Sequence, residues 1–207
     1  ERTLKANGVE VILGDGIEAF EPEADTVIAR LHSGKELEAP CVILSIGVRP
    51  ENELARSAGL KLGPRGHIMV NSFQQTSDPA IYAAGDAVET RCAITGEPVR
   101  VPLGGPANRQ GRVIADHIAD PQSARPYPGS LGTAIVRVFD LAAGTTGLNE
   151  KRLAQLGLPF EKTLISDFNH ASYYPGATPL TLKLLYCPRT EKLYGAQAFG
   201  NEGVDKR

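Results

Sequence analysis

The residues best suited to hold a polar ligand lie mid-chain, where a run of small residues ends in a glycine and a carboxylate. Residues Ile81 to Ala84 are expected to form a short buried strand, and Gly85 and Asp86 follow it directly. Ligands of α/β sheets bind at the carboxyl ends of strands. Gly85 permits a close approach of the backbone, and the Asp86 carboxylate can accept hydrogen bonds from sugar-like hydroxyl groups. A Gly-Asp dipeptide alone would equally fit an ordinary turn.

A second candidate site is the start of a helix further along the chain. The apolar residues of 107–118 have roughly helical spacing, and Leu103, Gly104, Gly105 and Pro106 lead into them. Proline suits a first helical turn, where free N–H groups and the helix dipole favour a negative charge. The alternative is an ordinary helix with a Gly-Pro entry and no ligand.

A third candidate is a late loop that carries an imidazole and two phenol groups. Residues 169–177 contain His170, Tyr173 and Tyr174 beside a Pro-Gly turn. A tyrosine hydroxyl can hydrogen-bond a thiolate or donate a proton to a reacting group. The alternative is that both tyrosine rings pack on the sheet to which the loop belongs.

Two other glycine patterns carry weaker signals. Gly47 ends an apolar run, which fits either a close approach of a ligand or an ordinary turn. Residues 14–19 fit G-x-G-x-x-A, but Pro22 interrupts the helix that a dinucleotide-binding pattern must open. The acidic Asp15 and Glu18 would also repel phosphate. We therefore interpret residues 14–19 as a plain strand and turn.

The elements that must position these residues change in character along the chain. Up to residue 120 the sequence predicts an α/β pattern with a closing helix turn at Glu1 to Gly8, strands 9–13, 26–31, 36–38, 41–46 and 68–70, and a helix at 53–58. The apolar run 41–46, with Cys41, is expected to be a parallel strand covered on both faces. Three prolines then mark a linker, at positions 121, 126 and 128. Beyond it we expect an α+β module with strands 133–139, 163–166, 181–186 and 193–199, and a helix capped by Asn149 and Gly157.

Composition narrows the functional class. The 207 residues carry 42% hydrophobic and 22% charged side chains and a formal net charge of -2. This balance indicates a globular protein and gives no general attraction to nucleic acid. The longest apolar run is too short to span a bilayer, and no signal peptide is visible, so the cytoplasm is the default location. Three widely spaced cysteines suit a reducing compartment and predict no metal site.

The stretch from Thr76 to Ala87 closely resembles the second flavin-contacting segment of the FAD-dependent pyridine nucleotide-disulfide oxidoreductases. In that family the matching aspartate holds the ribityl chain of FAD, and a similar helix follows it with the pattern Ala-Asn-x-Gln-Gly-Arg. The resemblance implies that FAD is contacted by the residues around both motifs: Gly85, Asp86, Leu103, Gly104 and Gly105. Gly47 lies in a segment similar to the family's Gly-x-Arg-Pro-Asn element, which implies a contact with NAD(P)H. Glu51 stands where the family usually has asparagine.

Residues 169–177 are similar to the His-Ala-x-Tyr-Tyr-Pro-Gly loop of the coenzyme A-disulfide and persulfide reductases in that family. There the loop crosses the dimer and places a tyrosine hydroxyl beside the redox cysteine of the partner subunit. The resemblance implies a catalytic role for Tyr174 first and Tyr173 second. It also implies that His170 and Asn108 face the coenzyme A substrate.

The end of the chain, Gly200 to Arg207, resembles the family's Gly-Lys-Glu-Gly-Val-Asp-Lys-Arg stretch. Asn201 stands where lysine is common, which argues against phosphate binding at that position. We interpret Lys206 and Arg207 as part of a solvated face.

The resemblance implies a partial two-dinucleotide-domain fold that binds FAD and NAD(P)H, followed by an α+β dimerisation domain. Residues 1–60 would form the second half of the NAD(P)H-binding domain, 61–125 the C-terminal segment of the FAD-binding domain, and 126–207 a dimerisation domain incomplete at its C-terminus. The implied activity is electron transfer from NAD(P)H through FAD to a disulfide or persulfide of coenzyme A, in a homodimer. The alternatives are an NADH oxidase or peroxidase of the same family, and a non-catalytic dimerisation module.

Both ends of the chain read as internal positions, because a helix should begin upstream of Glu1 and no cap follows Val204. None of the three cysteines matches the redox position of the family. We therefore expect a fragment of a longer enzyme, inactive by itself. Neither the choice between NADH and NADPH nor the final electron acceptor is predicted from these residues.

Overall fold

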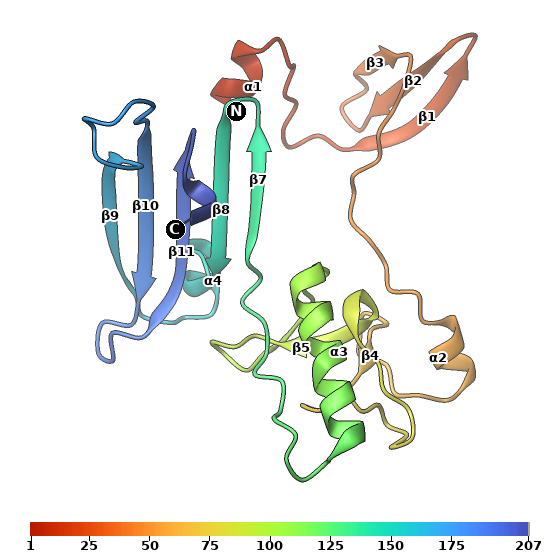
Figure 1. Cartoon of the computed structure of the whole chain (residues 1–207). Coiled ribbons are helices and arrows are strands. Elements are labelled where there is room, and N and C mark those ends of the chain that lie inside the picture. The colour runs from red at the N-terminus through yellow and green to blue at the C-terminus, as the bar shows by residue number, and fades with distance from the viewer. Residues whose placement is uncertain (207) are drawn as a thin grey trace. The chain divides into compact units, whose positions relative to one another are not determined.

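A computed structural model describes residues 1–206 of the chain (Figure 1). The chain divides into two compact units, Glu1–Val48 and Arg49–Arg207. Each unit has its own strands and its own buried residues, and each is described by itself.

The first unit holds a short helix and a three-stranded antiparallel meander. The helix α1 (Arg2–Ala6) ends at Gly8 as expected, where the Val9 N–H donates to the Leu4 carbonyl at 3.0 Å. The strands are β1 (Ile17–Glu23), β2 (Thr26–Leu31) and β3 (Glu36–Ala39), and they pair in sequence order. The expected hairpin is confirmed. Because β1 begins directly after Gly16, no helix opens at residues 14–19.

The prediction of two strands in this unit is wrong. Residues 9–13 and 41–46 have no strand pairing, and their apolar side chains are exposed: Leu13 by 72% and Ile43 by 88%. Cys41 is exposed as well, rather than packed inside a strand. A β-strand exists only when a neighbour accepts its backbone hydrogen bonds, and within this unit only β1, β2 and β3 pair with one another. An apolar run signals burial but does not supply that neighbour.

The first part of the second unit includes one long helix. It contains α2 (Glu53–Ser57), the short strands β4 (Ile68–Met69), β5 (Val88–Arg91) and β6 (Pro98–Val99), the 3-10 turn η1 (Gly85–Ala87) and α3 (Gly104–Ala119). β4 and β5 are parallel, and β6 is antiparallel to β5. Ala55, Ile68 and Val88 form the buried core. The strand expected at 81–84 is wrong: a single bridge joins Tyr82 to Gln75, and the chain then turns into η1.

The second part is a five-stranded antiparallel sheet with the order β7-β8-β11-β10-β9 (Figure 1). Its strands are β7 (Ala134–Val138), β8 (Leu141–Gly147), β9 (Glu161–Phe168), β10 (Pro179–Tyr186) and β11 (Leu193–Gly200). β8 escapes sequence-based detection because Leu-Ala-Ala-Gly-Thr-Thr-Gly has no polar–apolar alternation. Ala142, Leu180, Ala198 and Val204 form a core cluster, the last from the 3-10 turn η2 (Val204–Lys206).

The helix α4 (Glu150–Gln155) is bounded by the residues that the sequence predicts. The Asn149 side chain accepts a hydrogen bond from the Arg152 N–H at 2.9 Å. At the other end Gly157 has φ +64, and the Leu158 N–H donates to the Leu153 carbonyl at 3.0 Å. Leu153 is 0% exposed, so the short helix is anchored through its apolar face.

The proline-rich stretch between α3 and β7 lacks helix or strand but is fixed to its neighbours. The Ser130 N–H donates to the Arg91 carbonyl at 2.8 Å, and the Tyr127 and Ser130 hydroxyls share a hydrogen bond of 2.7 Å. Gly129 has φ +94, and a Cβ there would lie 2.6 Å from the Arg91 carbonyl oxygen, so glycine is required. Within residues 1–206, no helix is long and apolar enough to cross a membrane.

Candidate functional site

Gly85, the first residue of η1, is held against α3 by a buried amide. Its N–H donates to the Oε1 atom of Gln110 at 2.7 Å, and Gln110 is only 1% exposed. Gly85 has φ +83, a backbone conformation that favours glycine, and a Cβ there would lie 3.7 Å from the Cβ of Ala107. The hydrogen bond between Gly85 and Gln110 therefore fixes the backbone position of the next residue, Asp86.

A second contact fixes the stretch before Gly85 to the far end of the same helix. The Tyr82 hydroxyl and the Nδ1 atom of His117 share a hydrogen bond of 2.8 Å. The His117 ring also stacks on Phe73, with 4.5 Å between the ring centroids. Segment 82–87 is thus attached to α3 at two places, through Gln110 and through His117.

The carboxylate of Asp86 is left free by this arrangement. Its residue is exposed, and the side chain forms no hydrogen bond or ion pair with any other residue of 1–206. The backbone of Asp86 is held in place while its carboxylate oxygens have no partner within residues 1–206, so they are available to accept hydrogen bonds from a ligand.

The start of α3 is equally open. The helix begins at Gly104, with Leu103 as its N-cap residue, slightly earlier than the sequence predicts. Among residues 1–206 the N–H groups of Gly104 and Gly105 have no acceptor, and a Cβ at either glycine would meet nothing within 4 Å. Pro106, in the first turn, has no N–H to satisfy. The free N–H groups and the helix dipole together favour a negative charge here.

A hollow of about 380 Å³ lies beside this first turn. Its walls come from α3 and from the fixed stretch before β7, and they include Leu103, Gly105, Pro106, Arg109 and Tyr127. Of the residues that the resemblance assigns to flavin binding, Leu103 and Gly105 line the hollow, and Gly85 is held against the same helix by its hydrogen bond to Gln110. The structure adds two residues that the sequence did not single out: Gln110, which fixes Gly85, and Arg109, which brings a cation to the hollow.

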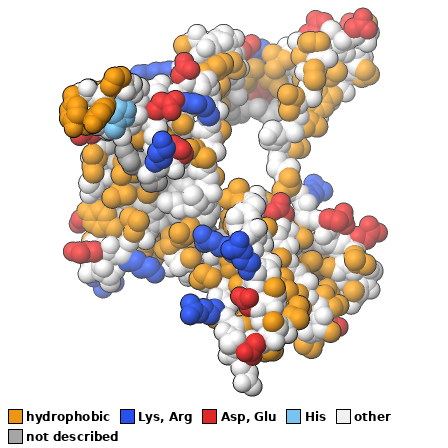
Figure 2. Space-filling model, viewed as in Figure 1, with side chains coloured by type: hydrophobic (Ala, Val, Ile, Leu, Met, Phe, Trp, Pro, Cys, Tyr) orange, Lys and Arg blue, Asp and Glu red, His pale blue; other side chains and the backbone are white. Residues whose placement is uncertain are grey.

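The tyrosine loop lies between β9 and β10 and presents both rings to solvent. Tyr173 is 82% and Tyr174 60% exposed, and their ring centroids are 4.9 Å apart. The base of the loop is closed by Asn169, whose N–H donates to the Thr178 carbonyl at 2.9 Å and whose Oδ1 accepts from the Thr178 N–H at 3.0 Å. Figure 2 shows hydrophobic side chains and a histidine gathered over this loop. The rings therefore contact each other and do not pack into the core of their own sheet.

Three predicted residues remain: Asn108, His170 and Gly47. Asn108 is exposed on α3, and His170 is exposed at the base of the tyrosine loop. Gly47 belongs to the first unit, where it has φ +94 and open space around it. Within residues 1–206 no group of three or more histidine, cysteine, aspartate or glutamate side chains could hold a metal ion.

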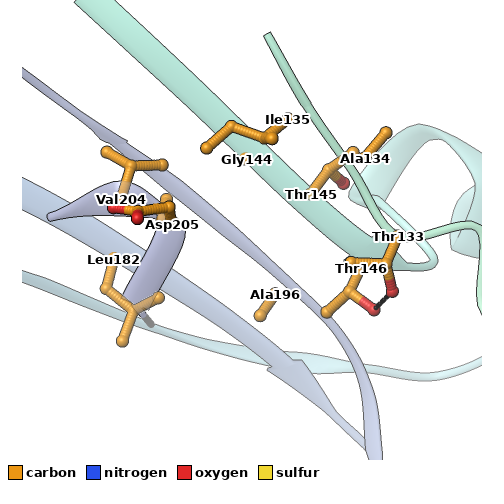
Figure 3. A pocket seen from close by; sticks show the side chains of 11 residues that line it. Thr133, Ala134, Ile135, Gly144, Thr145, Thr146, Leu182, Ala196, Val204 and Asp205 are labelled. Atoms are coloured by element: carbon orange, nitrogen blue, oxygen red, sulfur yellow. Dashed lines mark hydrogen bonds between the residues drawn. The ribbon is translucent and has the colours of Figure 1, made fainter.

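One further hollow lies on a face of the five-stranded sheet (Figure 3). It has a volume of about 260 Å³ and is lined mainly by small residues, among them Gly144 and Ala196. The hydroxyls of Thr133 and Thr146 share a hydrogen bond of 2.7 Å at one end, and Val204 and Asp205 lie at the other (Figure 3). Its lining offers one carboxylate, Asp205, and no partner acid or base beside it.

Comparison with known families identifies the class of protein. Residues 1–111 match the pyridine nucleotide-disulphide oxidoreductase family, and residues 133–206 match the dimerisation domain of that family. The chain belongs to the pyridine nucleotide-disulphide oxidoreductase family. The mixed α/β fold followed by an α+β dimerisation domain, predicted from the sequence, is confirmed.

Individual relatives match this chain over part of their own length. The NAD(P)H sulfur oxidoreductase (CoA-dependent) of Pyrococcus furiosus is 38% identical over 169 residues, which cover 82% of this chain and 38% of the relative. The NADH oxidase of Methanocaldococcus jannaschii is 36% identical over 207 residues, 100% of this chain and 45% of the relative. The crystal structure of reduced Bacillus anthracis CoADR-RHD superposes with a TM-score of 0.92 and 46% identity, covering 99% of this chain and 36% of that one. The chain thus spans less than half the length of each.

Proposed function

We propose that the chain works as part of a longer flavoprotein that passes electrons from NAD(P)H through FAD to a disulfide or persulfide of coenzyme A. The observation that carries this proposal is the open start of α3 beside the fixed Gly85 and the free Asp86 carboxylate. Family membership and the CoA-dependent relative of Pyrococcus furiosus support it. The tyrosine loop supports the coenzyme A branch in particular.

The residues at the start of α3 fit one end of FAD. Asp86 would accept hydrogen bonds from hydroxyl groups of the ribityl chain. Leu103, Gly104 and Gly105 would line the flavin edge through their backbone, with two free N–H groups directed at its negative charge. This helix-end interaction is worth on the order of 1 kcal/mol. FAD, when bound, supplies hydride acceptance and electron transfer, while the protein supplies binding, orientation and electrostatics.

The overall reaction with coenzyme A disulfide would consume NAD(P)H and a proton and yield NAD(P)⁺ and two coenzyme A thiols. Tyr174 would donate a hydrogen bond or proton to the leaving thiolate, with Tyr173 in a second position beside it. His170 and Asn108 would face the coenzyme A substrate. Gly47 would allow the nicotinamide of NAD(P)H to approach the backbone.

The assembly that we propose is a homodimer formed through the dimerisation domain matched at residues 133–206. The exposed strand β9 and the exposed tyrosines favour a surface that a second subunit covers. We place the domain boundaries after residues 60 and 125, and the protein in the cytoplasm, where NAD(P)H and coenzyme A meet under reducing conditions.

A second candidate function is NADH oxidation with oxygen or peroxide as acceptor. The NADH oxidase of Methanocaldococcus jannaschii favours it, because its similarity extends over all 207 residues. A third possibility from the sequence, a dimerisation module without chemistry, predicts that the tyrosines are dispensable.

The test is an acceptor comparison in the whole protein that contains this chain. Oxidation of NADH and of NADPH is followed with coenzyme A disulfide, oxygen or hydrogen peroxide as acceptor. We expect production of two free thiols per NAD(P)H oxidised with coenzyme A disulfide, at a rate well above that with oxygen. Turnover with oxygen or peroxide alone would favour the oxidase.

A matched pair of variants tests the tyrosine loop. Tyr174→Phe should lower kcat with coenzyme A disulfide by about 100-fold if its hydroxyl is a general acid. Tyr186→Phe removes a hydroxyl from β10 whose hydrogen-bond partners within residues 1–206 are Thr163 and Glu161, and serves as the control. Unchanged turnover in Tyr174→Phe would favour a scaffold role for the loop.

A further inference from the structure

A polar hollow of about 520 Å³ lies between the tyrosine loop and the segment that follows β11. It joins two stretches that are distant in sequence, the loop at 169–177 and the end of the chain at 200–206. The lining residues are Asn169, His170, Gly176, Glu202, Gly203 and Lys206. The hollow therefore adjoins the exposed Tyr173 and Tyr174 without including them.

The hollow is lined by one cation, Lys206, and one carboxylate, Glu202. Its one carboxylate, Glu202, is paired with Arg137, whose Nη2 lies 2.7 Å from Oε1 and also donates to the Asn201 carbonyl at 3.0 Å. Lys206 and His170 have no ion pair with any residue of 1–206. The neighbouring acid, Asp205, lines the hollow on the sheet face instead.

The walls of the hollow are held in place before any ligand arrives. Gly203 has φ +82, and a Cβ there would lie 3.1 Å from the Cβ of Asn169, which is 8% exposed. Asn169 and Thr178 exchange two hydrogen bonds at the loop base. The Asn201 side chain donates to the Asp140 carbonyl at 3.0 Å, so its amide is turned toward the β7–β8 turn. Asn201 therefore does not line the hollow, whereas the Lys206 side chain does.

We propose that this hollow is a phosphate subsite for the coenzyme A substrate, with Lys206 and His170 contacting the phosphate oxygens. This inference rests on the proposed function. It makes the subsite the reason that the protein binds coenzyme A in preference to smaller thiols. Lysine binds phosphate as a compact point charge, and an imidazole N–H adds a directional donor. In coenzyme A the phosphates lie at one end and the sulfur at the other. A phosphate held here would therefore orient the disulfide relative to the exposed tyrosines.

The test compares substrates that differ in their phosphates, using the whole protein with its flavin. KM is measured for coenzyme A disulfide, for dephospho-coenzyme A disulfide, which lacks the ribose 3′-phosphate, and for pantethine, which has no ribose phosphate or pyrophosphate. We expect Lys206→Gln to narrow the KM gap between coenzyme A disulfide and pantethine by about fivefold, the scale of one exposed charge pair. Lys206→Arg should restore the gap. Lys151→Gln, on α4 and away from the hollow, is the matched control.

The three substrates also separate the two phosphate sources. If Lys206→Gln also narrows the difference in KM between dephospho-coenzyme A disulfide and pantethine, the subsite binds the pyrophosphate. If that difference is unchanged, the subsite binds the 3′-phosphate. A gap unaffected by Lys206→Gln and by His170→Asn would overturn the subsite. If a variant loses its flavin and cannot be assayed, the wild-type protein still tests the proposal. Equal wild-type KM values for coenzyme A disulfide and pantethine would then overturn the subsite. A wild-type protein that reduces none of these disulfides refutes the proposed function instead.

Discussion

Two pairs of glycines in the second unit differ in what surrounds them. In the sheet, a Cβ on Gly195 would collide with the Leu148 carbonyl oxygen, and one on Gly200 would lie 2.8 Å from the Pro179 carbonyl oxygen. At the start of α3, a Cβ on Gly104 or Gly105 would meet nothing. The first pair is needed by the packing of the protein itself. The second pair leaves space that this chain does not fill, which is the property expected of a ligand-binding surface.

The largest effect should come from the sheet. Gly195→Ala forces β11 away from the Leu148 backbone and should lower the free energy of unfolding by more than about 4 kcal/mol. Chemical denaturation followed by circular dichroism measures this loss. Gly111→Ala, in an open position of α3, should cost nothing or stabilise. Comparable losses in both variants would remove the distinction between the two kinds of glycine.

The same distinction should hold for apolar side chains. Leu185 is 0% exposed in β10, so Leu185→Ala should destabilise the second unit by about 3 kcal/mol through the cavity that it leaves. Ile43 is 88% exposed, and Ile43→Ala in the 207-residue chain should change stability by less than about 0.5 kcal/mol. A large cost at Ile43 would show that residues 41–46 are buried in solution.

A substitution at the open pair should have effects of opposite sign on folding and on cofactor binding. Gly105→Ala should raise the stability of the chain by about 0.5 kcal/mol, because alanine loses less backbone entropy in a helix. In the whole protein the added methyl group should weaken FAD binding by about fivefold, or about 1 kcal/mol. Thermal unfolding and flavin titration give the two values. Tighter or unchanged flavin binding would argue against a backbone contact at Gly105.

A pH-dependent effect concerns the turn that joins β10 and β11. Hydrogen bonds from Thr190 and Tyr194 lower the pKa of the buried Cys187 thiol from 9.0 to about 6. The folded state therefore favours the thiolate, and its stabilising effect should appear as pH rises from about 6 toward 9.0 and vanish as pH falls through about 6. The Tm difference between wild type and Cys187→Ala should widen over that range. Cys41→Ala, at an exposed position, is the control, and a parallel pH dependence in all three proteins would contradict the thiolate.

The elements that the sequence predicts well are those whose signals are local. Asn149 and Gly157 bound a helix through their own side chain and backbone, and the hairpin of β2 and β3 brings its partner strand within a few residues. Residues 9–13 and 41–46 are also clearly apolar. Whether they form strands depends on a neighbouring strand, and their own sequence does not show whether one is present.

The candidate site divides in the same way. Asp86 and Gly104 stand out in the sequence because they lie in compact motifs. Gln110 and Lys206 also lie in motifs, but those motifs do not show that Gln110 accepts a hydrogen bond from Gly85 or that Lys206 lines a hollow with the base of the tyrosine loop, both distant along the chain. Distances of that kind are set by tertiary packing and are not visible in residue type or spacing.

The central claim is that Asp86 and the open start of α3 hold one end of FAD, and flavin affinity in the whole protein tests it most directly. Asp86→Ala and Asp116→Ala each remove one exposed carboxylate from this region, the second from the later turns of α3. Equilibrium titration with FAD should show a dissociation constant raised by roughly tenfold or more in Asp86→Ala, since hydrogen bonds to a charged group contribute about 1.5–3 kcal/mol. Asp116→Ala should bind FAD as the wild type does. Equal affinity in both variants would contradict the account.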